Sequence, residues 1–378
     1  MDFSLSAEQS ALQDSVRKFC REQYSIKQRQ IVARESHGFS QVHWNLFAEL
    51  GWLGAGLPED CGGFGGSAVE YSILAEEFGR ALVLAPYVAS AMVPAQAIRK
   101  SVCTTVCRQM VESLVRGQAL FAFAHSESGD GGSCSYVETS ARIGPSGEYI
   151  LNGQKTPVLG GSHAIRFVTS ARTSGAAGDR SGLSLFVVDI ALPGILTRSF
   201  RLLDGTSATE LQFRDVVLPA TALLGTEGAA ADAIETAIAF MLLGLCSQAV
   251  GAMDDVIAVT AKHLKNRRAY GTTLIEFQAL QHRLADMLIE LELSRSITHR
   301  TLSVFARTED AAQRLTVASA AKALVGRSAR FVAAHGIQLH GAMGMVEEYV
   351  IGQHFKQLTV IDNLYGNSDF HWARCAQK

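Results

Sequence analysis

The sequence has no marked excess of charge of either sign, because 34 Lys and Arg oppose 36 Asp and Glu and leave a formal charge of −2. No run of basic residues stands out, and nucleic-acid binding requires clustered positive charge. The seven cysteines are scattered and odd in number, and they form no cluster with histidine at metal-ligand spacing. We therefore expect no nucleic-acid partner, no disulfide framework and no metal site, and a cytoplasmic location.

The N-terminus lacks the basic segment and apolar run of a signal peptide, so no such signal is expected. One stretch, from Thr236 to Met253, contains no charge and reaches the length of a short membrane span. It includes Gly244 and Gln248, and it continues directly into Asp254. This pattern favours a helix buried on all sides in a bundle, and we expect no membrane span.

What is present points to a large folded chain, since 48% of the 378 residues are apolar and 19% are charged. The first third has helical periodicity: Ser6 and Gln9 have capping-box spacing, and a second helix is predicted from Gln41 to Leu50. The segment from Leu57 to Gly66 contains a proline and four glycines, so it is not expected to form a regular helix.

The pattern changes near Gly117 to short runs typical of strands. Asn152 and Gly153 stand between extended residues and predict a hairpin. From Ala229 onward the pattern is helical again, with a long helix predicted from Asp310 to His335. Such segregated blocks predict an α+β fold with three units, at residues 1–117, 118–226 and 227–378.

Five segments, in order along the chain, resemble motifs of the acyl-CoA dehydrogenase family. They are Phe3–Gln9, Leu57–Gly63, Leu211–Pro219, Arg267–Gly271 and Gln338–Gly344. The resemblance covers essentially the whole chain. It implies an N-terminal helical domain, a middle β-barrel domain and a C-terminal four-helix bundle.

The family resemblance also implies a cofactor and a reaction. FAD lies between domains and across a subunit interface, with an acyl-CoA thioester against the flavin. A carboxylate removes the α-proton while the β-hydrogen leaves as hydride to the flavin. The implied partners are an acyl-CoA substrate, an electron-acceptor flavoprotein and further subunits.

Residues that match the family's FAD-binding motifs provide the candidate cofactor site. An arginine fork suits a pyrophosphate, and glycine permits close approach of the backbone. Ordinary alternatives are a surface arginine, core packing, a solvated helix residue, a helix-ending turn and a surface loop. The candidates are Ser126, Arg267, Tyr270, Gln278, Gln338, Gly341 and Gly344.

The chain departs from the family pattern on the flavin side. Gly132 replaces a serine that faces the acyl-CoA, and Pro157 and Leu159 stand where a tryptophan and a threonine contact the flavin. Leu159 has no side-chain donor, so we expect a flavin to be held differently or less tightly here.

Both family positions for the catalytic glutamate lack an acid. One slot holds Tyr365 and the other, on the first bundle helix, holds Met241. A tyrosine with an ordinary pKa of about 10 is a poor base at neutral pH. Asp369 is a weak substitute, as are Asp362 and His371, and the catalytic residue stays unassigned.

The tail Leu364–Asp369 and the segment Arg166–Arg172 most resemble bacterial small-subunit members of the family, of the pimeloyl-CoA dehydrogenase type. Three functions stay open: an acyl-CoA dehydrogenase, alone or as a subunit; a non-catalytic partner that shares FAD; and other acyl-CoA chemistry, by a lyase, desulfinase or oxygenase. The assembly is expected to be a homodimer, a homotetramer or a heterotetramer with a related subunit.

Overall fold

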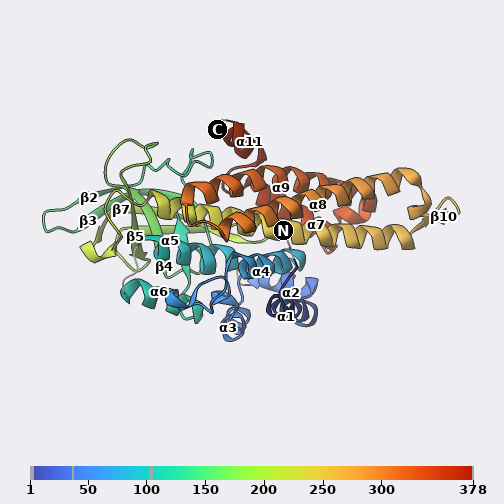
Figure 1. Ribbon diagram of the computed structural model, residues 1–378, viewed down its shortest axis with the longest axis horizontal. Coiled ribbons are helices and arrows are strands. Elements are labelled where there is room, and N and C mark those ends of the chain that lie inside the picture. The colour runs from blue at the N-terminus through green and yellow to red at the C-terminus, as the bar shows by residue number, and fades with distance from the viewer. Residues whose placement is uncertain (1–3, 36–37, 102–104, 377–378) are drawn as a thin grey trace.

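The computed structural model describes residues 4–35, 38–101 and 105–376, which form a helical block, a β-sheet and a long helical bundle (Figure 1). Phe3 of the opening motif lies outside these residues. The first block contains α1 (Ala7–Gln23), α2 (Ile26–Glu35), α3 (Gln41–Glu49), α4 (Ala68–Arg80), α5 (Val93–Ser101) and α6 (Thr105–Val115). The predicted capping box is confirmed, because Ser6 Oγ accepts Gln9 N–H at 3.1 Å while the Gln9 side chain accepts Ser6 N–H.

The glycine-rich segment after α3 forms turns and one short 3-10 helix (Glu59–Cys61) rather than an α-helix, as predicted. A Cβ on Gly63 would lie 2.1 Å from the Leu57 carbonyl oxygen, and one on Gly66 would lie 1.5 Å from that of Ala55. Only glycine permits this close approach of two backbone segments. The end of the segment therefore folds back tightly onto its own beginning and onto Ala55.

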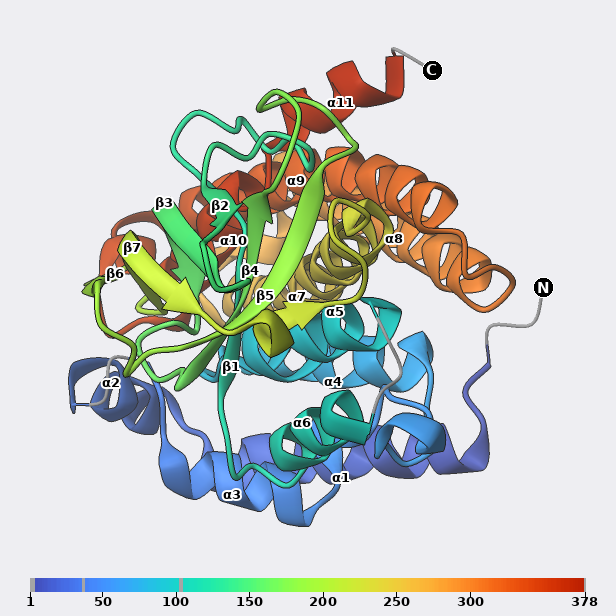
Figure 2. The same cartoon turned by 90° about the vertical axis from the view of Figure 1, so that its left-hand side faces the viewer.

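The middle of the chain forms one eight-stranded sheet in the order β6-β7-β3-β2-β4-β5-β8, with β1 paired to β4. Figure 2 shows this sheet at one end of the bundle and above the helices of the first block. The strands are β1 (Phe121–Ala124), β2 (Ser140–Ile143), β3 (Tyr149–Leu159), β4 (Arg166–Arg172), β5 (Leu183–Asp189), β6 (Ile195–Arg201), β7 (Ser207–Leu218) and β8 (Leu223–Leu224).

The hairpin predicted at Asn152 and Gly153 is wrong. β3 runs straight through both residues, and its pairing with β7 shifts register between Leu151 and Gly153. Gly153 has φ +146°, so the Asn-Gly pair forms a bulge rather than a turn. The turn between β2 and β3 lies earlier, where Gly147 has φ +86°.

The C-terminal bundle is built around α7, whose uncharged stretch is buried as predicted. The window that could span a membrane by length and composition is 94% buried, which identifies α7 as a core helix. Asp310 caps α9, which continues past its predicted end to His340. The bundle contains α7 (Ala231–Asn266), the hairpin β9 (Arg268–Ala269) and β10 (Thr272–Thr273), α8 (Gln278–Phe305), α9 (Ala311–His340), α10 (Val350–Asn363) and α11 (Ser368–Ala376).

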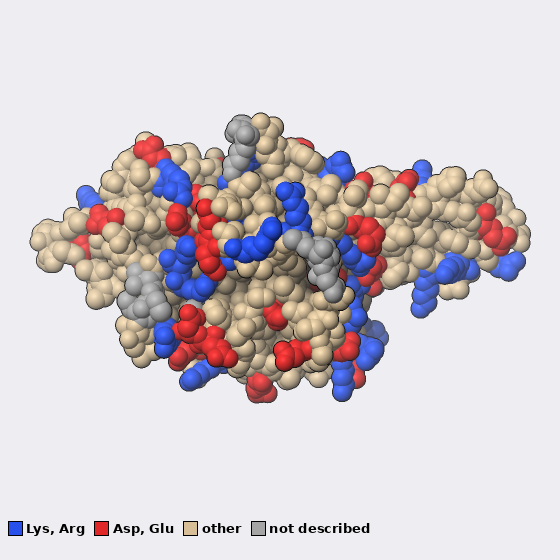
Figure 3. Space-filling view, viewed as in Figure 1, with Lys and Arg blue, Asp and Glu red and all other residues tan. Residues whose placement is uncertain are grey.

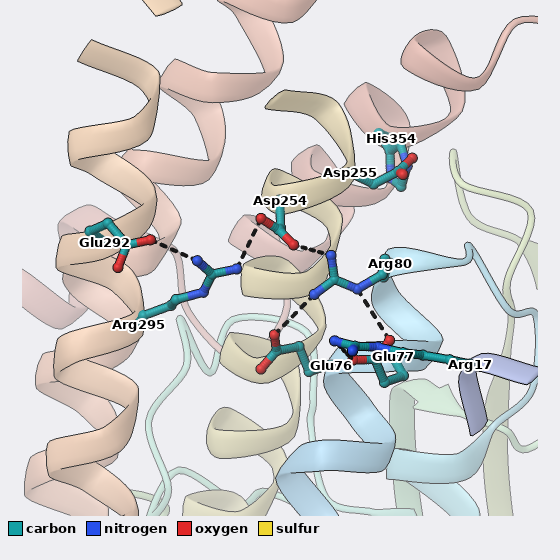
Figure 4. Close-up of polar contacts among 9 residues, drawn as sticks. All are labelled: Arg17, Glu76, Glu77, Arg80, Asp254, Asp255, Glu292, Arg295 and His354. Atoms are coloured by element: carbon teal, nitrogen blue, oxygen red, sulfur yellow. Dashed lines mark hydrogen bonds and ion pairs between the residues drawn. The ribbon is translucent and has the colours of Figure 1, made fainter. Parts of the chain in front are cut away.

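A network of ion pairs joins the first helical block to the bundle (Figure 4). Asp254 on α7 binds Arg80 of α4 and, at 2.9 Å, Arg295 of α8. Arg80 also contacts Glu76 and Glu77 on its own helix. The two blocks are therefore fixed to one another by charge as well as by apolar packing. Elsewhere on the face drawn in Figure 3, basic and acidic side chains are interspersed.

Candidate functional site

A cavity of about 310 Å³ lies where the loop after β1, the end of β3 and the turn between α10 and α11 meet. We call it the loop pocket. Its wall includes Ser126, Asp130, Pro157, Leu364 and Tyr365. The fold thus brings the predicted Ser126 loop together with the altered segment of β3 and the predicted base slot at Tyr365.

A buried ion pair fixes the loop of this pocket. Lys155 Nζ lies 2.7 Å from a Glu127 carboxylate oxygen, and both side chains are almost fully buried. Glu127 also accepts the backbone N–H groups of Glu138 and Thr139 at 2.6 and 3.0 Å. Burial pushes the pKa of Glu127 up, but Lys155 and these hydrogen bonds outweigh it and leave the pKa below its ordinary value. Glu127 is therefore an anchored carboxylate rather than a proton acceptor.

Asp130 is a wall residue that the sequence did not single out. Its two carboxylate oxygens accept the backbone N–H groups of Glu127 and Gly132 at 3.1 and 2.9 Å. Successive backbone N–H groups in a glycine-rich loop form an anion-binding site. Asp130 occupies these donors itself, so the loop holds its own anion. An acid followed by glycines in the loop was the available sequence signal.

Tyr365 is held rigidly in the wall of the loop pocket. Its backbone has φ +55°, and its carbonyl oxygen lies 3.1 Å from His371 Nε2. Its buried hydroxyl makes no hydrogen bond with a described residue. Burial, followed by the charge of Asp130, raises the tyrosine pKa, and nearby Ser126 offsets part of this rise without reaching hydrogen-bond geometry. The hydroxyl is therefore protonated at neutral pH and is no general base.

The second glutamate slot belongs to a smaller cavity of about 80 Å³, which we call the inner cavity. Met241 on α7 is 1% exposed and lies in its wall beside Leu245. Leu364 lines both the inner cavity and the loop pocket, so one side chain lies between the two spaces. The methionine adds apolar surface and no proton acceptor.

None of the three substitute bases lines the loop pocket. Asp369 is exposed in the first turn of α11. Asp362 is buried, and its carboxylate accepts Ser368 N–H at 3.1 Å and pairs with Arg330 at 3.2 Å. Burial and the Lys322 charge lower the pKa of His371 to about 3, so it is neutral near pH 7.

The other predicted residues gather at the far end of the bundle, where α7 and α9 end and α8 begins. We call this region the bundle corner; it consists of Arg267, Tyr270, Gln278, Gln338, Gly341 and Gly344. Arg267, Gln278 and Gln338 are exposed, and Tyr270 is 97% exposed. The Arg267 guanidinium has no ion-pair partner among the described residues. Gly341 has φ +59° and open space around it, whereas a Cβ on Gly344 would meet the Ile337 carbonyl at 3.0 Å.

Two neutral histidines support the bundle corner. The rings of His263 and His340 lie 4.3 Å apart and tie the end of α7 to the end of α9. Burial, followed by the Arg267 charge, lowers the pKa of His263, and burial with His263 lowers that of His340 to about 4. His340 also contacts Thr260 and Tyr349 at 3.2 and 3.1 Å. The residues packed beneath the bundle corner are therefore uncharged.

The bundle corner and the loop pocket lie at opposite ends of the bundle. At 1.5 Å per residue, α7 alone separates Met241, beside the pocket, from Arg267 by about 39 Å. Figure 1 shows the α7–α8 connection projecting away from the sheet. A dinucleotide does not span this distance, so the two groups of residues in one chain do not serve one bound molecule.

Three family models match the chain. Those described as the acyl-CoA dehydrogenase N-terminal, middle and C-terminal domains match residues 6–118, 122–216 and 215–378. Acryloyl-CoA reductase (NADH) of Anaerotignum propionicum is 29% identical, over 98% of this chain and 94% of that protein. Butyryl-CoA dehydrogenase from Megasphaera elsdenii has a TM-score of 0.90 at 25% identity, covering 100% of this chain and 99% of that one. A chain of the ChsE4-ChsE5 complex from Mycobacterium tuberculosis has a TM-score of 0.88 at 21% identity, covering 100% and 98%, which shows the shared fold.

Proposed function

Because this chain belongs to the acyl-CoA dehydrogenase family, we propose that it is one subunit of an FAD-dependent acyl-CoA dehydrogenase, beside a related chain that carries the catalytic carboxylate. Members of this family bind FAD and are oxidoreductases that act on CH–CH groups. In the proposed assembly, the bundle corner of this chain completes the cofactor site of its partner. The partner's own glutamate would remove the α-proton, and FAD, held in part by the corner of this chain, would supply the hydride acceptor.

The observation that carries this proposal is the contrast between the two ends of the bundle. At the corner, an exposed arginine fork without an ion-pair partner and an open glycine turn suit a pyrophosphate. In the loop pocket, Tyr365 and Met241 stand in the base slots, and Asp130 already occupies the loop's donors. The residues present thus fit the adenosine and pyrophosphate end of FAD well and its ring end poorly.

The residues of the corner have distinct roles in the proposal. Arg267 neutralises the pyrophosphate, and Gln338 and Gly341 offer an amide and an unobstructed backbone. Tyr270 and Gln278 contact the adenosine, while Gly344 permits the turn that presents them. Ser126 stays a candidate for contacting the flavin ring. The negative charge of Asp130 in the same pocket would repel a phosphate placed nearby.

The test is to purify this chain alone and together with a related chain that has glutamate at the slot of Tyr365. Visible spectra are recorded before and after adding a panel of acyl-CoA thioesters without oxygen. The assembly is expected to be yellow and to bleach with some thioester, whereas this chain alone does not bleach. Steady dehydrogenation by this chain alone would overturn the assignment.

Asp130 favours one second candidate, in which a homo-oligomer is active without another subunit. Asp130 is the one acid in the loop-pocket wall, other than the anchored Glu127, among the described residues. It would then be the proton acceptor. In that case Asp130→Asn abolishes the bleaching by the chain alone, while Asp369→Asn, which alters an acid outside the pocket, leaves it unchanged.

A further inference from the structure

The inner cavity stays open even though its glutamate slot holds Met241. Its sides are apolar and include Leu84, Val88, Leu245 and Ile361. Leu364 stands in the wall of both spaces, so an acyl chain that enters from the loop pocket would reach the inner cavity past this one side chain. An alkyl stem suits these walls, because apolar surface is removed from water on both sides.

One end of this cavity is polar. Arg29 on α2 donates to Leu82 O at 3.1 Å, to Gln353 Oε1 at 3.0 Å and to the Asp204 carbonyl oxygen. Gln357 lies one helical turn beyond Gln353 on α10. Arg29, Asp204 and Gln357 therefore form one cluster in the cavity wall, which we call the polar end. Gln357 precedes Leu364 by seven residues, or about 10 Å along the helix.

The polar end contains a buried acceptor without a partner. Gln357 is 8% exposed, and its Oε1 makes no hydrogen bond with a described residue. Buried amide groups are normally hydrogen-bonded, because an unsatisfied one loses its contact with water and gains nothing. An amide presents both acceptor and donor, and a hydroxyl, which also does both, satisfies it in either orientation.

The charges at the polar end argue against a carboxylate as the ligand group. Arg29 donates hydrogen bonds to three acceptors. The negative charges of Asp204 and Glu347 also partly offset its positive charge. Asp204, whose carboxyl accepts Thr206 N–H at 3.0 Å, is also a lining residue of this cavity. A second carboxylate would face this acid and a carbonyl oxygen, whereas a neutral donor would not be repelled.

We propose that the inner cavity binds an acyl group whose far end carries a hydroxyl, with Gln357 as the residue that selects it. This proposal rests on the proposed function, in which the acyl group is carried as a CoA thioester. It adds the class of acyl group that the chain would bind. Because the base slots hold Tyr365 and Met241, binding in this chain does not depend on turnover. The cavity thus distinguishes hydroxylated from plain acyl groups.

The test measures binding of three CoA thioesters of equal chain length to the full-length chain by calorimetry. They are hexanoyl-CoA, ω-hydroxyhexanoyl-CoA and adipoyl-CoA, which end in methyl, hydroxyl and carboxylate. The hydroxyl compound is expected to bind about tenfold more tightly than the other two, as one added hydrogen bond provides. Equal binding of the hydroxyl and methyl compounds, or tightest binding of adipoyl-CoA, would overturn the proposal.

Gln357→Leu is the matching variant, because it keeps the approximate size and removes the amide. It should abolish the preference for the hydroxyl compound, and Thr359→Val, on the same helix, should keep it. The variant's thermal midpoint is expected to be no lower than that of the parent chain, since a buried unsatisfied acceptor is removed. A preference that survives in Gln357→Leu contradicts the proposal.

Failure here and failure of the proposed function are distinguishable. If none of the three thioesters binds to this chain, the inner cavity is no acyl site. The FAD content of the assembly, and its dependence on Arg267, still report on the partner-subunit function, because that measurement uses the other end of the bundle.

Discussion

The two ends of the bundle differ in how they treat their polar groups. At the bundle corner, Arg267 and the Gln338 turn are exposed and lie over a histidine pair in which His340 is buried and His263 half-buried. In the loop pocket, the donors of the loop are already taken by Asp130. One end presents unsatisfied groups to an outside ligand, and the other satisfies them internally.

This difference indicates that the bundle corner and the loop pocket, the two halves of a shared cofactor site, can change independently. Since about 39 Å of α7 separates them, a substitution in the pocket leaves the corner's geometry intact. In the proposed assembly, the corner would contact a partner's cofactor, whereas the pocket would contact the chain's own. Loss of the base in this chain is therefore compatible with a retained role at the corner.

The largest predicted effect breaks the loop pocket alone. Lys155→Met leaves Glu127 buried without its counter-charge, and removing one partner of a buried ion pair costs about 3–5 kcal/mol. The free energy of unfolding, from denaturant titration, should fall by that amount. The His263–His340 contact is remote, so the corner is expected to stay ordered.

A paired substitution provides the control. Glu127→Gln together with Lys155→Met removes both charges, and the glutamine oxygen can still accept the N–H groups of Glu138 and Thr139. Most of the lost stability should return. A single Lys155→Met variant that loses less than about 1 kcal/mol contradicts the account of the pocket as an ion-pair-anchored loop.

The second prediction breaks the corner alone. Arg267→Ala removes the guanidinium that we propose binds the pyrophosphate, and hydrogen bonds to charged groups contribute about 1.5–3 kcal/mol. FAD bound by the assembly with the related chain should weaken by roughly tenfold to a hundredfold, measured by absorbance after gel filtration. Arg268→Ala is the matched control, because Arg268 contacts Gly271 O in the same hairpin. If both variants lose FAD affinity equally, the effect comes from the positive charge of the hairpin as a whole and not from a specific contact of Arg267.

The third prediction concerns the ion-pair network around Asp254, which lies between the two ends of the bundle. Breaking this network should lower stability without altering either site. Asp254→Asn weakens the contacts with Arg80 and Arg295 and is expected to cost about 2 kcal/mol. Burial raises the pKa of Asp254, but Arg80 and Arg295 outweigh this and hold it below its ordinary value. A lowered carboxylate pKa adds stability that is complete above the unfolded pKa of about 4 and is lost as pH falls through the folded pKa.

Unfolding measured from pH 7 to pH 3 checks this sign. The parent chain should lose stability below about pH 4 more steeply than Asp254→Asn, because the variant lacks the titrating group. Glu59→Gln, at an exposed carboxylate outside the network, should follow the parent. If Asp254→Asn loses stability with falling pH as steeply as the parent chain does, Asp254 does not cause the acid sensitivity.

The sequence was a good guide wherever a local pattern determines structure. The Ser6 capping box, the Asp310 cap and the buried α7 follow from short-range spacing or composition. The Asn152–Gly153 hairpin was wrong because pairing with β7, more than fifty residues later, turns the same dipeptide into a bulge. Tertiary pairing decided between two structures that the local sequence permits equally.

The candidate site was predictable only in part, for a similar reason. The residues of the bundle corner follow from motif positions, and the fold brings them together at the ends of α7 and α9. The role of Asp130 depends on where two backbone N–H groups point, and that of Gln357 on the absence of a nearby donor. Neither property is visible from residue type or spacing.

The smallest predicted effect compares one tyrosine from each end. Tyr365→Phe removes a buried hydroxyl without a partner, so stability should stay equal or rise by up to about 1 kcal/mol. Tyr349→Phe removes a hydroxyl that lies 3.1 Å from His340 Nδ1 beneath the corner, and it should cost about 1 kcal/mol. Thermal midpoints of both variants, and dehydrogenation by the assembly, provide the measurement. If Tyr365→Phe lowers the assembly's activity while Tyr349→Phe does not, the Tyr365 hydroxyl takes part in the chemistry and the loop pocket of this chain is an active one.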